Sequence, residues 1–261
     1  MGNLKDIQNM KDERNISIDK VGVKNINYPI IVLDKVKKHQ HTVASINMFV
    51  NLPHHFKGTH MSRFIEVLNK YRHEIGISNF DEILNEMQEK LEAESAHLEV
   101  SFPYFMEKEA PITKSKGLME YQCMFIGSKK RGEDIDFIIK IKAPVTSLCP
   151  CSKEISEFGA HNQRSEVTVT FKFEKFIWIE DIVEIIESCS SSPVYSILKR
   201  PDEKYVTEKA YNNPMFVEDM VRELAAKLKE VEEITWFTVE AENFESIHNH
   251  SAYALIESNN I

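Results

Sequence analysis

The order of the predicted secondary-structure elements constrains the fold more than any other feature of this 261-residue sequence, because the same order occurs twice. The first half reads strand, strand, helix, helix, strand, strand (ββααββ). Alternating apolar residues predict the strands and apolar residues spaced three or four apart predict the helices, at about 28–36, 42–51, 61–73, 79–94, 97–106 and 118–128 in that order.

The second half repeats this order from about Asp134. Its first strand is marked by Phe137, Ile139 and Ile141, and the elements that follow are predicted at about 167–173, 178–189, 215–231, 233–242 and 251–257. Asn213 is a suitable N-cap for the helix at 215–231, with Pro214 at its first position. Two consecutive ββααββ units imply antiparallel sheets with both helices on one face, which is an α+β class.

The sequence divides into three predicted segments. Residues 1–21 are hydrophilic and are expected to form a flexible N-terminal arm, residues 22–133 form the first unit, and residues 134–261 form the second. Each unit is long enough to bury a core of its own. The apolar content of 42% and the charged content of 28% are ordinary for a globular protein.

The charge and hydropathy of the chain exclude several classes of partner. A net charge of −9 disfavours a nucleic-acid-binding protein, because contacts to phosphates need clustered Lys and Arg. No apolar run approaches the roughly 20 residues of a membrane helix, and the N-terminal segment has no apolar signal-peptide region. We therefore expect a cytoplasmic protein without membrane or nucleic-acid partners.

The segment from Thr146 to Ser165, TSLCPCSKEISEFGAHNQRS, carries the strongest signal for chemistry. Cys149 and Cys151 flank a proline of fixed φ, and His161 follows Cys149 by twelve residues. A thiolate with an imidazole suits a transition metal such as zinc. The other two cysteines, Cys123 and Cys189, lie in apolar patterns and are expected to be buried thiols, since four cysteines are too few for a disulfide scaffold.

Three strings in the sequence resemble the type IB GTP cyclohydrolase I family: SLCPCSKEIS…GAHNQRS, GTHMSRF at 58–64 and KRPDE at 199–203. The resemblance covers essentially the whole chain after the arm. It implies a tunnelling fold, in which tandem ββααββ units assemble as a homotetramer with active sites at subunit interfaces. It also implies conversion of GTP and water to 7,8-dihydroneopterin triphosphate and formate, the first step towards tetrahydrofolate-type pterins.

The resemblance implies one divalent metal per active site, held by Cys149, His161 and Glu203 with a coordination position left open for water or substrate. This ligand set would accept zinc, manganese or ferrous iron. On spacing alone Glu203 would be a solvated loop residue. Cys151 remains ambiguous, since it could replace Cys149 as a ligand, support the site from outside the ligand shell, or simply pack.

The resemblance also implies a set of substrate contacts. Glu218 would accept hydrogen bonds from guanine, and Glu245 and His248 would line the pocket, where His248 could transfer protons. His250 is expected to have no such role. No glycine-rich phosphate-binding motif is present, so side chains must hold the triphosphate. The candidates are His60, Ser62, Arg63, Lys153, Arg164 and Arg200.

Two alternatives remain open from the sequence. One is a nitrile reductase of the same fold superfamily, in which a cysteine forms a thioimide with a deazapurine and NADPH supplies hydride, although that family's NADPH-recognition motif is not found here. The other is a non-catalytic assembly protein whose Cys and His side chains hold a structural zinc.

Overall fold

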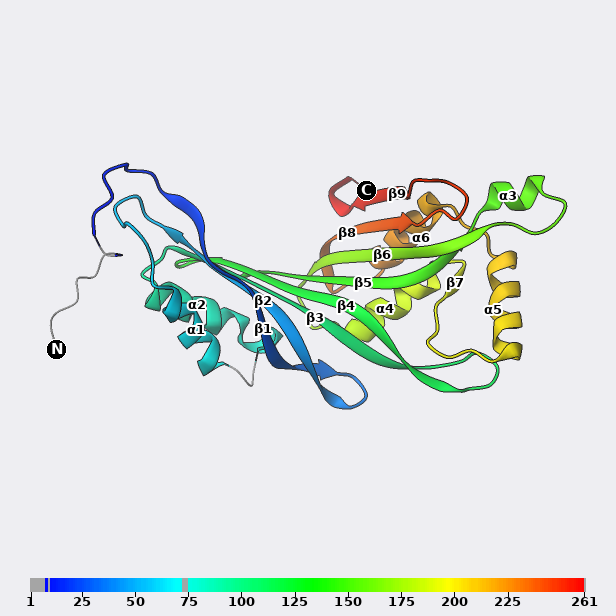
Figure 1. Ribbon diagram of the computed structural model, residues 1–261, viewed down its shortest axis with the longest axis horizontal. Helices are drawn as coiled ribbons and strands as arrows, with labels where there is room; N and C mark the ends of the chain where they lie inside the picture. Colours follow the sequence, from blue (N-terminus) through cyan, green and yellow to red (C-terminus); the bar gives the residue numbers. More distant parts are fainter. Residues whose placement is uncertain (1–7, 9, 72–74, 261) are drawn as a thin grey trace. The chain divides into compact units, whose positions relative to one another are not determined.

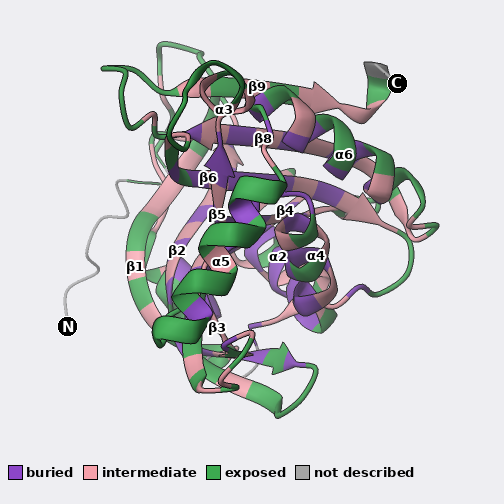
Figure 2. Ribbon diagram, turned by 90° about the vertical axis from the view of Figure 1, so that its right-hand side faces the viewer, coloured by how far each residue is buried: buried purple, intermediate pink, exposed green. Residues whose placement is uncertain are grey.

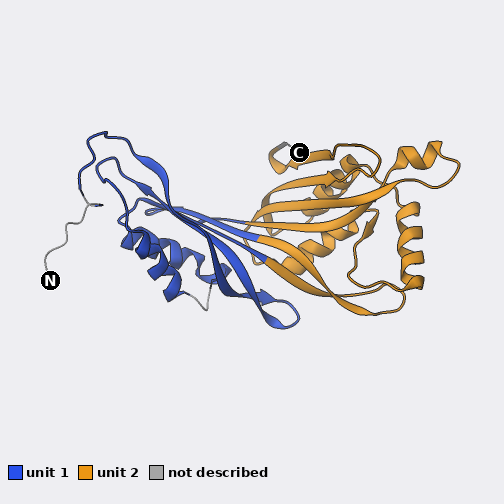
Figure 3. Cartoon of the chain, in the orientation of Figure 1, with its two compact units in different colours: residues 1–102, 124–138 blue, residues 103–123, 139–261 orange. Residues whose placement is uncertain are grey.

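The computed structural model describes residues 8, 10–71 and 75–260, which form two compact units. Unit 1 comprises residues 1–102 and 124–138, and unit 2 comprises residues 103–123 and 139–261 (Figure 3). The predicted boundary at 133/134 differs because strands β3 (Ser95–Glu109) and β4 (Lys116–Lys130) each contribute to both units. A strand of 15 residues extends about 50 Å, which exceeds the width of one small domain.

Unit 1 contains the first predicted ββαα order. Strands β1 (Ile18–Asp34) and β2 (Lys38–Leu52) form an antiparallel hairpin, and β2 also pairs with β3. Helices α1 (Met61–Lys70) and α2 (Phe80–Lys90), preceded by the short η1 (Ile77–Asn79), lie side by side against one face of these strands (Figure 1). Both helices end earlier than predicted, and part of the predicted 61–73 helix, residues 72–74, lies outside the described residues.

Part of the segment predicted as a flexible arm, residues 1–21, pairs with other parts of the chain. Strand β1 begins at Ile18, and Lys11 forms a β-bridge with Phe56. The amides of Lys57 and Gly58 donate to the carbonyls of Met10 and Gln8 at 3.0 and 3.1 Å. Backbone pairing therefore orders a hydrophilic stretch that has no apolar pattern of its own.

Unit 2 contains the second ββααββ order with three additions. Its predicted elements are β5 (Asp136–Leu148, whose first three residues belong to unit 1), β6 (Asn162–Phe173), α4 (Ile179–Ser188), α6 (Val217–Lys229), β8 (Ile234–Asn243) and β9 (Ala252–Glu257). The additions are α3 (Pro150–Ile155), the two-residue β7 (Ser192–Pro193) and α5 (Arg200–Asn212), and a short η2 (Ser258–Asn260) follows β9. Helices α4 and α6 contact each other and pack on β6 and β8.

The described strands pair antiparallel where their registers are given, and their order is β1-β2-β3-β4-β5-β6-β8-β9, with β7 beside β5. The predicted α+β class is confirmed. Within the part of the chain that the structure describes, no helix has the length and apolar character needed to cross a membrane.

The predicted start of the helix after Asn213 is wrong. Helix α6 begins at Val217 with Phe216 as its N-cap, whereas Asn213 is the C-cap of α5. The Asn213 amide donates to the carbonyls of Lys209 and Ala210 at 3.1 and 3.2 Å. The error follows from missing α5, which buries only Asp202 and Ala210 and so has no apolar stripe. Figure 2 shows α5 exposed along most of its length.

Candidate functional site

Cys149 occupies the turn between β5 and α3. It is the N-cap of α3, and Pro150 takes the first helical position, where the missing N–H costs nothing. The Cys149 amide donates to the His161 carbonyl at 3.1 Å, and its sulfur accepts a hydrogen bond from the Ser152 amide at 3.4 Å. An N–H donor directed at the sulfur stabilises negative charge there, which a metal ligand or nucleophile needs.

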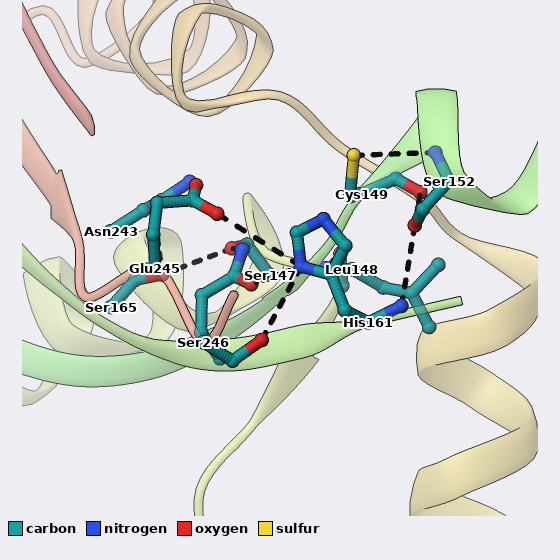
Figure 4. A network of polar contacts seen from close by, with 11 residues as sticks. Ser147, Leu148, Cys149, Ser152, His161, Ser165, Asn243, Glu245 and Ser246 are labelled. Atoms are coloured by element: carbon teal, nitrogen blue, oxygen red, sulfur yellow. Dashed lines mark hydrogen bonds and ion pairs between the residues drawn. The ribbon is translucent and has the colours of Figure 1, made fainter. Parts of the chain in front are cut away.

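Ser152 links the two ends of the loop between Cys149 and His161. Its hydroxyl donates to the Cys149 carbonyl at 3.1 Å and accepts from the His161 amide at 3.2 Å (Figure 4). Gly159 has a φ of +75°, a left-handed conformation that favours glycine, just before the chain enters β6. The structure thus brings Cys149 and His161 together although twelve residues separate them.

The imidazole of His161 is held at one nitrogen. Its Nδ1 lies 2.9 Å from Gln163 Oε1, 3.4 Å from Ser246 Oγ and 3.9 Å from Glu245 Oε2. The side chains of His161 and Glu245 are each only 13% exposed. Figure 4 shows the ring between the Cys149 thiol and the Glu245 carboxylate. Nε2 makes no hydrogen bond to any described residue, so it is the nitrogen available to a ligand.

The backbone before Cys149 is fixed from two directions. The Leu148 amide donates to Ser191 Oγ at 3.0 Å, and the Leu148 carbonyl accepts from the Met215 amide at 3.0 Å. The Ser191 amide in turn donates to the Thr146 carbonyl at 3.1 Å. The segments after α4 and before α6 therefore set the position of the Cys149 turn.

Glu203 lies in the first turn of α5, which is anchored by its neighbour. Asp202 is fully buried, and its carboxylate accepts from the amides of Ile112 and Thr113 at 2.8 Å each, from the Thr113 hydroxyl at 2.6 Å and from the Lys199 amide at 3.0 Å. Burial by itself raises the pKa of Asp202, but these hydrogen bonds hold it below its usual range. Asp202 thus fixes the helix that presents Glu203.

Glu203 itself is exposed and makes no contact with Cys149 or His161 in the described structure. At the other end of α5, Lys153 donates to the Tyr211 carbonyl at 2.5 Å and lies 4.4 Å from the centre of the Tyr211 ring. Eight residues separate Glu203 from Tyr211, or about 12 Å along the helix. Among the described residues, no group of three His, Cys, Asp or Glu side chains is positioned to hold a metal ion.

The donor chemistry nevertheless fits a divalent metal in part. Cys149 offers a sulfur next to an N–H donor, and His161 offers Nε2 while its Nδ1 is anchored, as is usual for imidazole ligands. These two side chains fit the ligand pair expected from the sequence. The third ligand is not assembled in the described chain.

Glu218 is exposed in the first turn of α6, beside a residue that already caps the helix. Asp219 accepts a hydrogen bond from the Phe216 amide at 3.0 Å. Because Asp219 supplies the capping interaction, Glu218 is left without a hydrogen bond or ion pair to the described residues and is free to meet a ligand.

The segment after β8 carries the other predicted pocket residues. The Phe244 amide donates to the Arg164 carbonyl at 3.0 Å, which holds the segment beside β6 and places Glu245 next to His161. His248 is exposed, and its ring stacks on that of His250 with centroids 5.2 Å apart.

The predicted triphosphate contacts are divided between the two units. In unit 2, Arg164 and Arg200 are exposed, whereas Lys153 is engaged with Tyr211. In unit 1, His60 is the N-cap of α1, and Ser62 and Arg63 lie in its first turn. The Arg63 guanidinium already has partners in unit 1, because it donates to the Lys90 carbonyl at 2.8 Å and lies 3.7 Å from Glu92.

The buried polar residues next to His161 were not predicted as part of the site, although the sequence carries a signal for them. Gln163 and Ser165 share the inward-facing side of β6 with Val167 and Val169. Polar residues in a row that is otherwise apolar are unusual in a core and call for hydrogen-bond partners. The thiols Cys123 and Cys189 are buried, as predicted.

Comparison with known proteins gives consistent matches over nearly the whole chain. The family model described as type I GTP cyclohydrolase FolE2 matches residues 4–254. A protein from Geotalea uraniireducens named GTP cyclohydrolase FolE2 is 64% identical over 254 residues, covering 97% of this chain and 93% of the relative. One of the same name from Geobacter metallireducens is 62% identical over 257 residues, covering 98% of both.

The solved structures similar to this chain include urate oxidases. The enzyme from Bacillus subtilis aligns with a TM-score of 0.53 at 8% identity, covering 93% of this chain and 100% of the other. A highly active mutant of the enzyme from Bacillus sp. TB-90 aligns with a TM-score of 0.56 at 9% identity, covering 92% and 99%. At sequence identities this low, the similarity is evidence for the fold alone. The structural match confirms the predicted tunnelling fold.

Proposed function

Because the chain belongs to the type I GTP cyclohydrolase FolE2 family, we propose that it hydrolyses GTP to 7,8-dihydroneopterin triphosphate and formate, the first step of tetrahydrofolate-type pterin synthesis. The family confirms the type I cyclohydrolase resemblance. The finer label, subtype IB, rests on the motifs and is part of this proposal. The proposed reaction makes the chain a hydrolase of cyclic amidine C–N bonds.

The observation that carries the proposed chemistry is the pairing of Cys149 with His161 through Ser152. The proposed site holds one divalent metal, Zn, Mn or Fe, through Cys149, His161 and Glu203. When bound, it would activate a water near neutral pH for attack on C8 of guanine. The fully buried anchor Asp202 supports the role of Glu203, because it fixes the helix turn from which Glu203 projects.

Two side chains in the segment after β8 are proposed to handle protons. Glu245 lies 3.9 Å from His161 Nδ1, and its carboxylate favours a proton on that nitrogen. His248 is exposed and can exchange protons with solvent, so it is suited to protonate the ring nitrogen that leaves when the imidazole of guanine opens.

Glu218 is proposed to hold guanine. A carboxylate can accept hydrogen bonds from N1–H and the 2-amino group together, and Glu218 is exposed and uncommitted. Arg164 and Arg200 are the best placed candidates in unit 2 for the triphosphate, since both are exposed. His60, Ser62 and Arg63 of a neighbouring subunit are the other candidates, and Lys153 would have to exchange its contact with Tyr211.

A homotetramer with active sites between subunits and a cytoplasmic location complete the proposal. The strand order ends at β1 and β9, and a 17-residue edge strand such as β1 is commonly covered by a partner. All four cysteines are free thiols, which is typical of a reducing compartment. Light scattering of the purified chain should give the mass of four copies.

The proposal is tested by incubating GTP with protein loaded with Zn, Mn or Fe(II) and measuring formate and the fluorescent pterin formed on oxidation. We expect turnover in the wild type, loss in Cys149→Ala and retention in the matched control Cys151→Ala, whose thiol is exposed. No product with any of the three metals rejects the proposal. NADPH oxidation without formate would indicate the reductase, and unfolding of Cys149→Ala would indicate a structural zinc.

A further inference from the structure

Four buried polar side chains lead from His161 into the core of unit 2, and the proposed reaction uses none of them. They are 7%, 0%, 0% and 3% exposed, in the order Gln163, Ser147, Ser165 and Asn243. His161 Nδ1 lies 2.9 Å from Gln163 Oε1, and Gln163 Nε2 lies 2.6 Å from Ser147 Oγ. Ser165 Oγ then lies 3.2 Å from Ser147 Oγ and 2.7 Å from Asn243 Oδ1.

The strand register brings these residues together. Ser147 of β5 is the cross-strand partner of Gln163 in β6, and Ser165 of β6 is the partner of Asn243 in β8. Small apolar residues would fit the same inward-facing positions without the cost of burying polar groups. A polar network at the end of three strands therefore needs a reason beyond packing. Among the described residues, it meets the proposed site through the contact between Gln163 Oε1 and His161 Nδ1.

The hydrogens of the network can all run in one direction. The His161 Nδ1–H donates to Gln163 Oε1, and the Gln163 amide donates to Ser147 Oγ. The Ser147 hydroxyl then donates to Ser165, and the single hydroxyl hydrogen of Ser165 takes the shorter contact, to Asn243 Oδ1. Each group from His161 to Ser165 then donates once along the chain and Asn243 accepts at its end, with no hydrogen in conflict.

The reverse direction would turn both amides and make His161 Nδ1 an acceptor. Glu245 decides between the two directions, because its carboxylate oxygen lies 3.9 Å from the same nitrogen and only accepts hydrogen bonds when ionised. The Glu245 carboxylate therefore favours a proton on Nδ1, which Gln163 Oε1 then accepts. The Ser246 hydroxyl, 3.4 Å from Nδ1, can donate or accept and favours neither direction.

We propose that Gln163 is a positioning residue that holds His161 as the Nδ1–H tautomer and so presents the Nε2 lone pair to the divalent metal beside Cys149. Ser147, Ser165 and Asn243 set which way the Gln163 amide faces. The inference rests on the proposed function only for the identity of the ligand that Nε2 meets. The tautomer itself is a property of the metal-free chain.

The tautomer is tested first on full-length, 15N-labelled apo protein at alkaline pH, where the ring is neutral. Long-range 1H–15N spectra distinguish protonated from unprotonated ring nitrogens, and His161→Gln identifies the His161 signals. We expect a protonated Nδ1 in the wild type and in Gln163→Glu, whose carboxylate also accepts. Gln163→Leu should shift the ring towards the Nε2–H form. A wild-type ring protonated at Nε2 overturns the inference.

Metal affinity gives the second readout, by titration of apo protein with Zn²⁺ or with Co²⁺ followed by its absorption spectrum. We expect Gln163→Leu to weaken binding about 10- to 100-fold and Gln163→Glu to restore it. The matched control is Gln88→Leu in unit 1, a buried glutamine that donates to the carbonyls of Glu94 and Lys129 at 3.2 and 3.1 Å. It should lower the melting temperature without changing metal affinity.

The two proposals fail separately. If Gln163→Leu binds metal like the wild type while GTP is still hydrolysed, the positioning role is wrong and the proposed function stands. If the wild type holds the Nδ1–H tautomer and binds metal but releases no formate from GTP, the proposed function is wrong and the positioning role stands.

Discussion

Replacing Ser191 by Ala tests how the Cys149 turn is held. Ser190, Ser191 and Ser192 are consecutive and buried, with exposures of 2%, 0% and 0%, yet their hydroxyls make different kinds of hydrogen bond. Ser191 Oγ accepts from the Leu148 amide at 3.0 Å. The hydroxyls of Ser190 and Ser192 instead donate to the carbonyls of Glu187 and Pro193, at 2.9 and 3.2 Å.

The expected cost differs because an amide has one hydrogen and a carbonyl has two lone pairs. Ser191→Ala leaves the Leu148 N–H buried without an acceptor, which costs about 1–3 kcal/mol. Ser190→Ala and Ser192→Ala each lose one ordinary hydrogen bond, about 0.5–1.5 kcal/mol. Since 1 kcal/mol shifts the melting temperature of a chain of this size by roughly 2–4 °C, we expect falls of roughly 2–12 °C for Ser191→Ala and roughly 1–6 °C for the other two.

The assay is thermal unfolding of the apo protein, followed by circular dichroism at one protein concentration so that any association is held constant. Ser191→Ala should melt lowest of the three and, because Leu148 precedes Cys149, it alone should also weaken metal binding. Equal melting temperatures for the three variants would show that Leu148 N–H finds another acceptor and that Ser191 does not hold the turn.

Three further outcomes are expected. Burial raises the pKa of Asp202, but hydrogen bonds, led by that from Thr113, lower it below the usual 3.8. The ionised Asp202 carboxylate therefore stabilises the fold at pH values above 3.8. This stabilisation is lost as the pH falls through the lowered pKa of the folded state. The difference in melting temperature between the wild type and Asp202→Asn should therefore be largest near neutral pH and should decrease in acid. Glu218→Gln should raise KM for GTP roughly 10- to 100-fold without changing metal affinity, whereas the neighbouring Asp219→Asn should lower only the melting temperature. Removing metal with a chelator should abolish formate release, and adding back Zn, Mn or Fe(II) should restore it.

The elements predicted correctly are those with one buried face. Strands β2, β3 and β4 alternate buried residues with half-buried or exposed ones, and helices α1, α2, α4 and α6 each bury one stripe, so the pattern in the sequence is the pattern of burial. Helix α5 has no such stripe. Its stability comes instead from the anchored first turn at Asp202, which pairs with residues about 90 positions earlier in the chain. A contact of that range leaves no local pattern.

Capping signals were misleading for the same reason. Asn213 followed by Pro214 is a common helix start, but the same two residues also suit a helix end, since Asn is a frequent C-cap and Pro cannot continue the helix. In the structure the Asn213 side chain donates to the Ser190 carbonyl at 3.0 Å, so it is not available to cap the helix that follows. Without knowing that α5 precedes Asn213, the sequence favours the wrong alternative.

In the candidate site too, residues joined by local contacts could be predicted from the sequence, whereas those joined by distant contacts could not. Cys149 and His161 could be paired from the sequence because one loop, closed by Ser152, carries both. The position of Glu203 relative to them depends on how α5 packs, and the position of α1 depends on a different unit. Motif matching can name such residues, but it cannot supply the geometry that would bring them together.

The HNQRS string shows how strand alternation assigns different tasks to adjacent residues. Gln163 and Ser165 face inward and are buried, so they can form the network behind His161, while Asn162 and Arg164, which alternate with them, are exposed. Because the side-chain period of a strand is two, a shift of one residue in the pairing with β5 would bury the Arg164 guanidinium and expose Gln163. The exposure that makes Arg164 a phosphate candidate and the burial that lets Gln163 orient His161 are therefore two consequences of one register, and changing the length of the loop between Cys149 and His161 should disturb both together.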